Sequence, residues 1–262
     1  MSQANYVVTG VASGIGAALA AQLLARGCSV TGFDVRPPAG AAFPCHGLDL
    51  ADLNAIDPAV ALAAGPFDGL CNNAGISPKP GQESAILTIN FFAQRTLTRA
   101  LLPRLAPGAS IVNMASRAGA RWRENIDQVK RLAALEPHDV AAFVRDERID
   151  AVRAYNLSKE AMIAWTMAES EAMTARQMRI NAVCPGAVAT GLLTDFAAAF
   201  GETMARNVAR AGRPGHSEEI AAIAAFLLDP QSSWLRGAEI SPDGGMGAFA
   251  TSDALGLAAL RL

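Results

Sequence analysis

The stretch Thr9-Gly10-Val11-Ala12-Ser13-Gly14-Ile15-Gly16 decides how this chain is expected to fold. It follows the apolar run Tyr6–Thr9, which is typical of a buried strand. It leads into Ile15, Leu19 and Leu23, which share one face of a helix. Gly27 then marks the end of that helix. The chain therefore begins with a strand, a glycine-rich turn and a helix.

A turn of this kind is suited to binding a pyrophosphate. Glycines let a phosphate approach the backbone, and the first turn of the helix offers free N–H groups and a positive dipole. Because the spacing G-x-x-x-G-x-G differs from the common dinucleotide fingerprint, an ordinary glycine-rich turn is the alternative. Its position between strand and helix favours a dinucleotide site, and the residues expected to form it are Gly10, Ser13, Gly14, Ile15 and Gly16.

Asp34 ends the next predicted strand, Ser29–Phe33. A carboxylate at this place accepts hydrogen bonds from the adenosine ribose and repels a 2′-phosphate, so NAD is favoured over NADP. Arg36 is the reason to keep NADP as the alternative, because its side chain is long enough to reach a phosphate. A solvated turn aspartate is the structural alternative for Asp34.

Strand and helix patterns alternate along the rest of the chain. Further strands are predicted at 47–50, 69–71, 110–114, 179–184 and 239–241. Helices are predicted at 53–63, 84–102, 154–175, 192–210 and 218–228. This alternation predicts a single α/β domain with a Rossmann-like, doubly wound parallel sheet.

Composition excludes several classes of protein. Hydrophobic residues make up 51% of the 262 residues, and 22 basic side chains face 24 acidic ones, for a net charge of −2. This balance argues against a nucleic-acid partner and against disorder. No apolar run is long enough to cross a bilayer, and no leader pattern is present, so a cytoplasmic protein without a membrane partner is expected. The four cysteines and three histidines are not spaced as metal ligands, so no metal site is expected.

Tyr155 and Lys159 lie four residues apart on a predicted helix and therefore share a face. A tyrosine is a poor base at neutral pH, but a nearby ammonium favours the phenolate and is expected to lower the pKa of the phenol. Such a tyrosine can exchange a proton with a substrate oxygen while hydride moves to or from a nicotinamide. The pair alone is a weak signal, because it occurs by chance on many helices.

Five motifs occur in a fixed order and give the chain a resemblance to the short-chain dehydrogenase/reductase family. They are TGVASGIG (Thr9–Gly16), NNAG (Asn72–Gly75), Ser116 after IVNMAS, YNLSK (Tyr155–Lys159) and CPGAVAT (Cys184–Thr190). The resemblance extends from Tyr6 to Gly245 and implies a homodimeric or homotetrameric oxidoreductase that acts on an alcohol or carbonyl compound.

The resemblance also implies roles for single residues. Tyr155 would be the general acid/base, and Lys159 would lower its pKa and bind the nicotinamide ribose. Ser116 would hydrogen-bond the substrate oxygen, and Asn90 would hold a water in a proton relay to Lys159. Further cofactor contacts would come from Asp49 and Leu50 near the adenine, from Asn73, Ala74 and Gly75 on the adenosine side, and from Pro185, Gly186, Val188 and Thr190 at the nicotinamide end. Each of these assignments has a structural alternative. Ser116 could cap the end of the strand, Asn90 could lie on the surface of its helix, and Pro185-Gly186 could form an ordinary turn.

A charged insertion lies between Ser116 and Tyr155, which are 39 residues apart, much farther than is usual in the family. Fourteen of the 33 residues in 121–153 are charged, and apolar positions predict two short helices joined at Pro137. They could roof the active site with Trp122, Ile126 or Phe143, or dock on a neighbouring helix or subunit. The segment 192–210, with Phe196, Phe200 and Met204, is the second candidate substrate-facing element.

The length of this insertion is similar to that in a bacterial subgroup containing coniferyl alcohol dehydrogenases and 3α-hydroxysteroid dehydrogenase/carbonyl reductases. The stretches GARW (Gly119–Trp122) and FDGLCNNAG (Phe67–Gly75) resemble the coniferyl alcohol type. The expected activity is NAD-dependent interconversion of an aromatic, allylic or alicyclic alcohol and its aldehyde or ketone. A hydroxysteroid dehydrogenase or carbonyl reductase is the alternative within the enzymes, and a non-catalytic dinucleotide-binding sensor or scaffold is the alternative of another class.

Overall fold

Seven parallel strands form one sheet at the centre of the molecule. The computed structural model describes residues 3–260, and the ends of the predicted domain, Met1–Ser2 and Arg261–Leu262, lie outside them. In spatial order β3-β2-β1-β4-β5-β6-β7, the sheet reverses direction of winding between β1 and β4, as in a doubly wound fold. The strands are β1 (Asn5–Thr9), β2 (Ser29–Asp34), β3 (Cys45–Gly47), β4 (Phe67–Asn72), β5 (Leu105–Met114), β6 (Arg179–Val183) and β7 (Glu239–Ile240).

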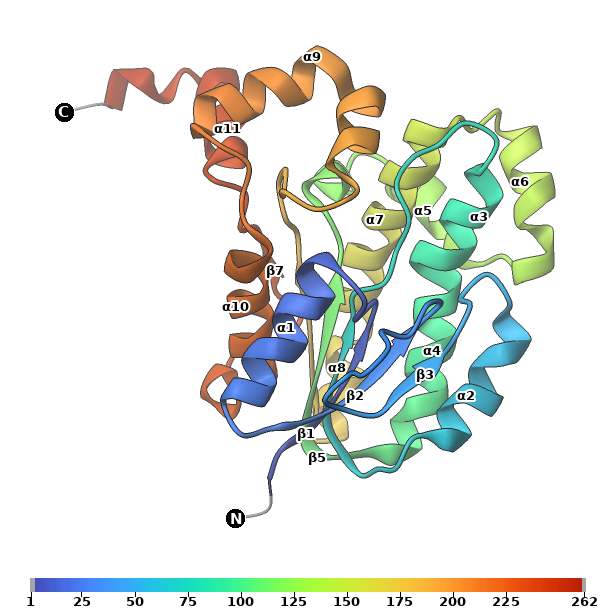
Figure 1. Cartoon of the computed structure of the whole chain (residues 1–262). Helices are drawn as coiled ribbons and strands as arrows, with labels where there is room; N and C mark the ends of the chain where they lie inside the picture. The colour runs from blue at the N-terminus through green and yellow to red at the C-terminus, as the bar shows by residue number, and fades with distance from the viewer. Residues whose placement is uncertain (1–2, 261–262) are drawn as a thin grey trace.

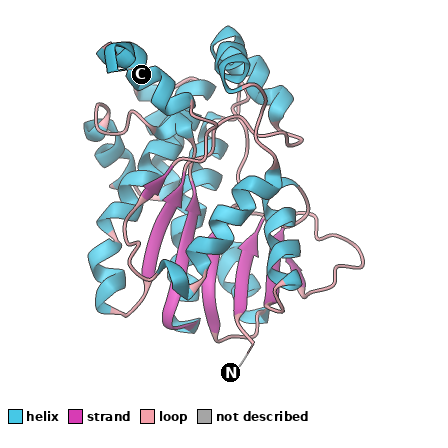
Figure 2. Cartoon of the chain, turned by 90° about the vertical axis from the view of Figure 1, so that its left-hand side faces the viewer, coloured by secondary structure: helices cyan, strands magenta, loops and turns pink. Residues whose placement is uncertain are grey.

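Helices cover both faces of this sheet (Figures 1 and 2). Helices α1 and α10 pack together on one face, while α2, α4 and α7 cover the other. The α-helices are α1 (Gly14–Ala25), α2 (Ile56–Leu62), α3 (Glu83–Leu87), α4 (Ala93–Leu101), α5 (Ile126–Ala133), α6 (Val140–Asp146), α7 (Ala151–Ala168), α8 (Ser170–Ala175), α9 (Leu193–Ala211), α10 (Ser217–Leu228) and α11 (Met246–Leu255). The predicted α/β architecture is thus confirmed.

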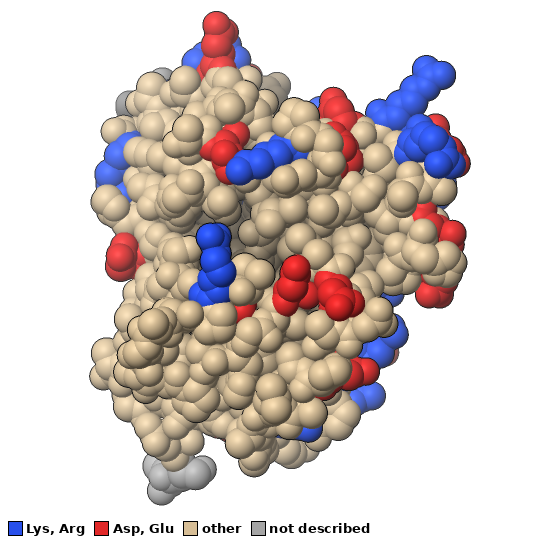
Figure 3. Space-filling model, turned by 45° about the vertical axis from the view of Figure 1, so that its right-hand side comes forward, with Lys and Arg blue, Asp and Glu red and all other residues tan. Residues whose placement is uncertain are grey.

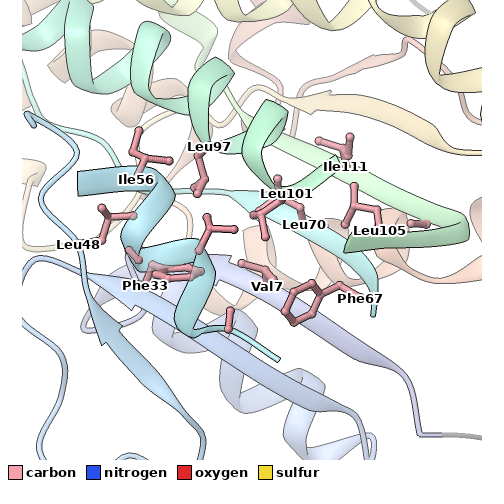
Figure 4. Close-up of a cluster of buried hydrophobic side chains, with 14 of the residues drawn as sticks. Val7, Phe33, Leu48, Ile56, Phe67, Leu70, Leu97, Leu101, Leu105 and Ile111 are labelled. Atoms are coloured by element: carbon pink, nitrogen blue, oxygen red, sulfur yellow. The ribbon is translucent and has the colours of Figure 1, made fainter. Parts of the chain in front are cut away.

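Alternate residues of the strands supply the two halves of the core. Val7, Leu70 and Ile111 point to the side of α2 and α4, where they pack with Phe33, Leu97 and other buried side chains (Figure 4). Val8, Cys71 and Val112 point to the opposite side and pack against α1 and α10. Because helices cover both faces, nearly every residue of the central strands β1, β4 and β6 is buried, which is typical of a parallel sheet.

Four local features differ from the sequence prediction. The strand predicted at 47–50 lies at Cys45–Gly47, because Leu48 and Leu50 are buried in the turn after it and not in the sheet. The helix predicted at 154–175 is divided at Glu169 into α7 and α8. The one predicted at 84–102 contains a π-helical turn at Thr88–Phe92, and helix α11 was not predicted at all.

The insertion forms the two predicted helices, α5 and α6, joined by a 3-10 turn at Pro137–Asp139. They pack against α7 and α3, and Val129, Leu132 and Phe143 join the apolar cluster there. A carboxylate beneath them, on the 1% exposed Glu160, accepts hydrogen bonds from Arg153 and Asn125. A buried charge with these partners binds the insertion to α7 and fixes its orientation.

Candidate active site

A cavity of about 810 Å³ opens at the carboxyl ends of the strands, where doubly wound proteins bind their ligands. Figure 3 shows one face of the molecule hollowed near its centre, with acidic and basic side chains at the rim. Most of the predicted site residues line the cavity, namely Gly10, Ser13, Gly14, Ile15, Asp34, Asp49, Leu50, Asn73, Ala74, Gly75, Ser116, Tyr155, Lys159, Pro185, Gly186, Val188 and Thr190. Gly16 and Asn90 lie behind this wall.

The glycine-rich turn has a shape that other residues cannot adopt. Gly10 has φ +72°, in the region that favours glycine, and a Cβ there would lie 2.9 Å from Asn73 Nδ2. A Cβ on Gly16 would collide with the Gly10 carbonyl oxygen, so Gly16 allows the helix to begin close to the turn. Among the described residues, no side chain caps the start of α1 and no acidic residue lies in its first turn. The turn and helix end therefore fit a pyrophosphate.

The Thr9 hydroxyl joins the ends of β1 and β4. It accepts hydrogen bonds from the backbone N–H groups of Asn73 and Ala74, each at 2.9 Å. The Asn73 side chain donates to the Thr9 carbonyl oxygen at 2.9 Å. These bonds hold the loop after β4 against the glycine-rich turn, and both line the same end of the cavity.

Asp34 lies at the end of β2, beside the turn. Its carboxylate accepts hydrogen bonds from the backbone N–H groups of Ala12 and Arg36, each at 2.9 Å. Both oxygens are thereby oriented, and the residue lines the cavity together with Arg36. A negative charge fixed in this position is suited to hydroxyl groups and opposes a phosphate.

Helix α7 and strand β5 bring three predicted catalytic side chains together. Lys159 is 5% exposed, and its Nζ donates to the Met114 carbonyl oxygen at 2.9 Å and lies 5.6 Å from the centre of the Tyr155 ring. Ser116 follows Met114 by two residues and hydrogen-bonds to Tyr155. Its oxygen also accepts from the Ala118 N–H at 3.1 Å, so the predicted capping role of Ser116 exists beside the contact with Tyr155.

The expected lowering of the Tyr155 pKa is not found. Burial raises the pKa of this phenol to about 12, and the hydrogen bond with Ser116 opposes the shift only in part. Burial also lowers the pKa of Lys159 to about 8. Both shifts have one cause, because a poorly solvated site disfavours phenolate and ammonium alike. The sequence argument considered the neighbouring charge and neglected desolvation.

Asn90 lies in the π-helical turn and is 1% exposed. Its side chain accepts from the Ile76 N–H at 2.8 Å and donates to the Ile76 carbonyl oxygen at 3.0 Å. A Cβ placed on Gly75 would lie 2.9 Å from Asn90 Oδ1 and 3.7 Å from Lys159 Nζ. Asn90 is therefore a buried side chain near Lys159 and not a residue of the helix surface. π-Turns of this kind are frequent at functional sites.

Helix α9 covers Tyr155. The rings of Phe196 and Phe200 meet the Tyr155 ring edge to face, with centroids 5.2 Å and 6.3 Å away. Phe196, Phe200 and Met204 line the cavity, as expected for a substrate-facing element. The helix bends at Gly201, whose φ is +49° and ψ is −131°.

A polar contact holds the front of α9 in place. Asp195, next to Phe196, accepts a hydrogen bond from the buried Ser77 hydroxyl at 2.7 Å and pairs with Lys79 at 2.9 Å. Hydrogen bonds from Ser77 and Lys79 lower the pKa of the Asp195 carboxyl. The loop between β4 and α3 is thus tied across the cavity mouth to the helix that shields Tyr155.

The insertion does not roof this cavity. Among the described residues, Trp122, Ile126 and Phe143 do not line the cavity. They pack instead in the apolar cluster between α3 and α7. Of the two possibilities left open by the sequence, the structure therefore supports docking on neighbouring helices. Several other lining residues were not singled out from the sequence, and four of them bear on the substrate region: Arg117, Thr203, Asn207 and Met246. Arg117 could have been found from its place directly after Ser116, whereas the other three depend on how α9 and α11 fold over the site.

The chain is similar to short-chain dehydrogenases over most of its length. A family model described as short chain dehydrogenase matches residues 4–126, and one described as Enoyl-(Acyl carrier protein) reductase matches residues 140–247. A coniferyl-alcohol dehydrogenase from Pseudomonas sp. is 32% identical over 249 residues, which are 94% of this chain and 97% of that protein. A 3-alpha-hydroxysteroid dehydrogenase/carbonyl reductase from Comamonas testosteroni is 30% identical over 92% of this chain and 96% of its own length.

A solved structure agrees with these matches. The crystal structure of a 3-alpha-hydroxysteroid dehydrogenase from Pseudomonas sp. B-0831, complexed with NADH, has a TM-score of 0.83 and 30% identity and covers 94% of this chain and 98% of its own. This chain belongs to the short-chain dehydrogenase/reductase family and is a dinucleotide-binding oxidoreductase. That assignment decides against the alternative of a non-catalytic sensor or scaffold.

Within residues 3–260, no three His, Cys, Asp or Glu side chains are grouped so that they could hold a metal ion. The helices in the same part of the chain include none with the length and apolar character needed to cross a bilayer.

Replacing Asp195 tests the contact across the cavity mouth. Asp195→Ala removes the acceptor of Ser77 and the partner of Lys79, so the contact of α9 with the loop after β4 should weaken by about 1–2 kcal/mol. We expect a several-fold higher KM and faster proteolysis of α9, with little change in Tm. Glu202→Ala, at an exposed site on the same helix, is the matched control. Equal effects of the two substitutions would contradict this role for Asp195.

Burial of Lys159 predicts a pH-dependent contribution to stability. Its pKa is 10.5 when unfolded and about 8 when folded, so between these values only the unfolded state keeps the proton and stability rises with pH. From about pH 7 to about pH 9.5, wild type should gain about 2 kcal/mol in free energy of unfolding relative to Lys159→Met. Urea unfolding at both pH values measures the difference. Lys130→Met, at an exposed position, should show no such change, and a pH-independent difference for Lys159→Met would refute the shift.

Proposed function

We propose that this oxidoreductase interconverts an aromatic, allylic or alicyclic alcohol and its aldehyde or ketone, with NAD as its preferred dinucleotide. One observation carries the proposal: the Tyr155 hydroxyl lies beside Ser116 in the cavity, under the rings of Phe196 and Phe200. Apolar walls around a proton-exchanging group suit a bulky, weakly polar substrate. The names of the two curated relatives, with aromatic and alicyclic alcohols as substrates, support the same class.

The cavity fits a dinucleotide. The glycine-rich turn approaches closely enough for a pyrophosphate, and the oriented carboxylate of Asp34 is suited to the adenosine ribose. Asp49 and Leu50 would contact the adenine, and Pro185, Gly186, Val188 and Thr190 would hold the nicotinamide end. When bound, the dinucleotide supplies the hydride acceptor or donor.

The protein itself would orient the substrate and move its proton. In alcohol oxidation, Ser116 hydrogen-bonds the substrate oxygen, and the phenolate form of Tyr155 takes the hydroxyl proton. Lys159 would stabilise that phenolate and bind the nicotinamide ribose, which offsets part of the cost of burial. Asn90, buried near Lys159, would hold a water that carries the proton onward. Carbonyl reduction uses the same contacts in reverse.

A hydroxysteroid dehydrogenase or carbonyl reductase is the second candidate, favoured by the TM-score of 0.83 to a steroid dehydrogenase. Its substrate would also lie against Phe196, Phe200 and Met204. A homodimeric or homotetrameric state and a cytoplasmic location remain predictions from the sequence.

Tyr155→Phe tests the proposed acid/base group. Turnover of cinnamyl alcohol, cyclohexanol and androsterone with NAD should fall by about three or more orders of magnitude, because the variant lacks the hydroxyl that would exchange the proton. Formation of NADH, followed by absorbance, measures turnover and ranks the three substrate classes. NADH binding, measured by fluorescence, should be retained. Substantial residual turnover would remove Tyr155 from this role, and a preference for none of these alcohols would argue against the proposed substrate class.

Asp34 tests the choice of dinucleotide. Asp34→Asn keeps an acceptor for the Ala12 or Arg36 N–H but removes the charge that opposes a 2′-phosphate. The ratio of kcat/KM for NAD to that for NADP should therefore fall by about tenfold or more. Asp34→Ala, which also removes the hydrogen bonds, should in addition raise the KM for NAD. An unchanged ratio in Asp34→Asn would show that charge does not set the preference.

A further inference from the structure

One charged side chain on the cavity wall has no part in the chemistry described above. Asp34, Arg36 and Asp49 lie at the adenosine end, and Lys159 lies beside Tyr155. Arg117 directly follows Ser116 on the wall and is the remaining charged lining residue among those described. A cation next to the group that binds the substrate oxygen lies where it can act on the substrate itself.

The backbone and side chain of Arg117 contact the segments that follow β6 and β7. Its N–H donates to the Pro185 carbonyl oxygen at 2.9 Å, just after β6. Its Nη1 lies 3.4 Å from Asp243 Oδ2, and a Cβ on Gly247 would lie 2.6 Å from the same Nη1. The guanidinium is therefore at the first turn of α11, next to the lining residue Met246.

Asp243 accepts from only one of the N–H donors of this guanidinium. The Asp243 carboxylate accepts from the Gly245 and Gly247 N–H groups at 3.0 Å and 2.7 Å, and its side chain is 8% exposed. It is thus already bound by the N-terminus of α11. Arg117 has five N–H donors but makes one long side-chain hydrogen bond within the described part of the chain, and its side chain remains 25% exposed.

A guanidinium with free donors on a largely apolar wall is suited to a carboxylate. Phe196, Phe200, Met204 and Met246 supply apolar surface, and the planar donors of arginine match the two oxygens of a carboxylate. We propose that Arg117 binds a carboxylate carried by the substrate. The substrate class is then an alcohol or carbonyl compound with an apolar body and a carboxylate at the end remote from the reacting carbon.

This inference rests on the proposed function and makes that function more specific. Its structural alternative is that Arg117 only joins the loop after β5 to α11 through Asp243. If Arg117 only joins these two segments, replacing it should change kcat/KM for all substrates equally. If Arg117 recognises the substrate, replacing it should lower kcat/KM for substrates that carry a carboxylate. A pair of aldehydes of similar shape separates the two roles.

The test compares reduction of 4-formylbenzoate with reduction of 4-methylbenzaldehyde, both with NADH. Wild type should prefer the carboxylate, and Arg117→Met should lower kcat/KM for 4-formylbenzoate by about tenfold or more, mainly through KM, while leaving 4-methylbenzaldehyde unchanged. Arg117→Lys, which keeps the charge without the planar donors, should be intermediate. Arg123→Met, at an exposed arginine of the insertion, is the matched control and should alter neither.

Two results would overturn the inference: equal losses on both aldehydes in Arg117→Met, or an unchanged preference for the carboxylate. If wild type reduces neither aldehyde, the proposed function is at fault, and calorimetry of 4-formylbenzoate binding to the NADH-bound protein tests Arg117 separately. Weaker binding to Arg117→Met than to wild type would support the inference, and equal or undetectable binding to both would overturn it.

Discussion

The hydrogen bond from the buried Lys159 ammonium to the Met114 carbonyl oxygen determines the geometry of the site. It joins helix α7 to the end of β5 at 2.9 Å. Tyr155 lies one turn before Lys159, and Ser116 lies two residues after Met114, so this bond also sets how the phenol faces the serine. The low solvation that makes the bond strong also disfavours the charged forms of both Lys159 and Tyr155.

The fold was largely predictable, because each signal for it is local in the sequence. Strand β1, the glycine-rich turn and α1 follow one another without a gap, and alternation of strands and helices leaves a parallel sheet as the consistent topology. The errors occur where tertiary contacts override local preference. Leu48 and Leu50 have the pattern of strand residues but are buried under α2. The break between α7 and α8 contains no proline or glycine from which it could have been predicted.

The site was predictable to the extent that its residues belong to short motifs. Those motifs identified the residues now found on the wall from Gly10 to Thr190, although their chemical roles remain proposals. Three properties depended on three-dimensional packing instead: the pKa of Tyr155, the docking of the insertion on α3 and α7, and the presence of Met246 on the wall. Periodicity defines an apolar face of a helix but does not say which surface it will cover.

The bend at Gly201 divides α9 into two parts with different anchors. The front part carries Phe196 and is held through Asp195, while the rear part is tied to α11 by the ion pair of Arg210 with Asp253 and by the stacking of Arg210 on Phe249. Because the backbone at Gly201 adopts angles that strain residues with a Cβ, a glycine at this position permits the bend. The two parts of the helix are therefore held by different contacts, one to the loop after β4 and one to α11. The apolar wall over Tyr155 is thereby supported from both ends of one bent helix, so that a substitution at either anchor acts on the wall without touching the residues that line it.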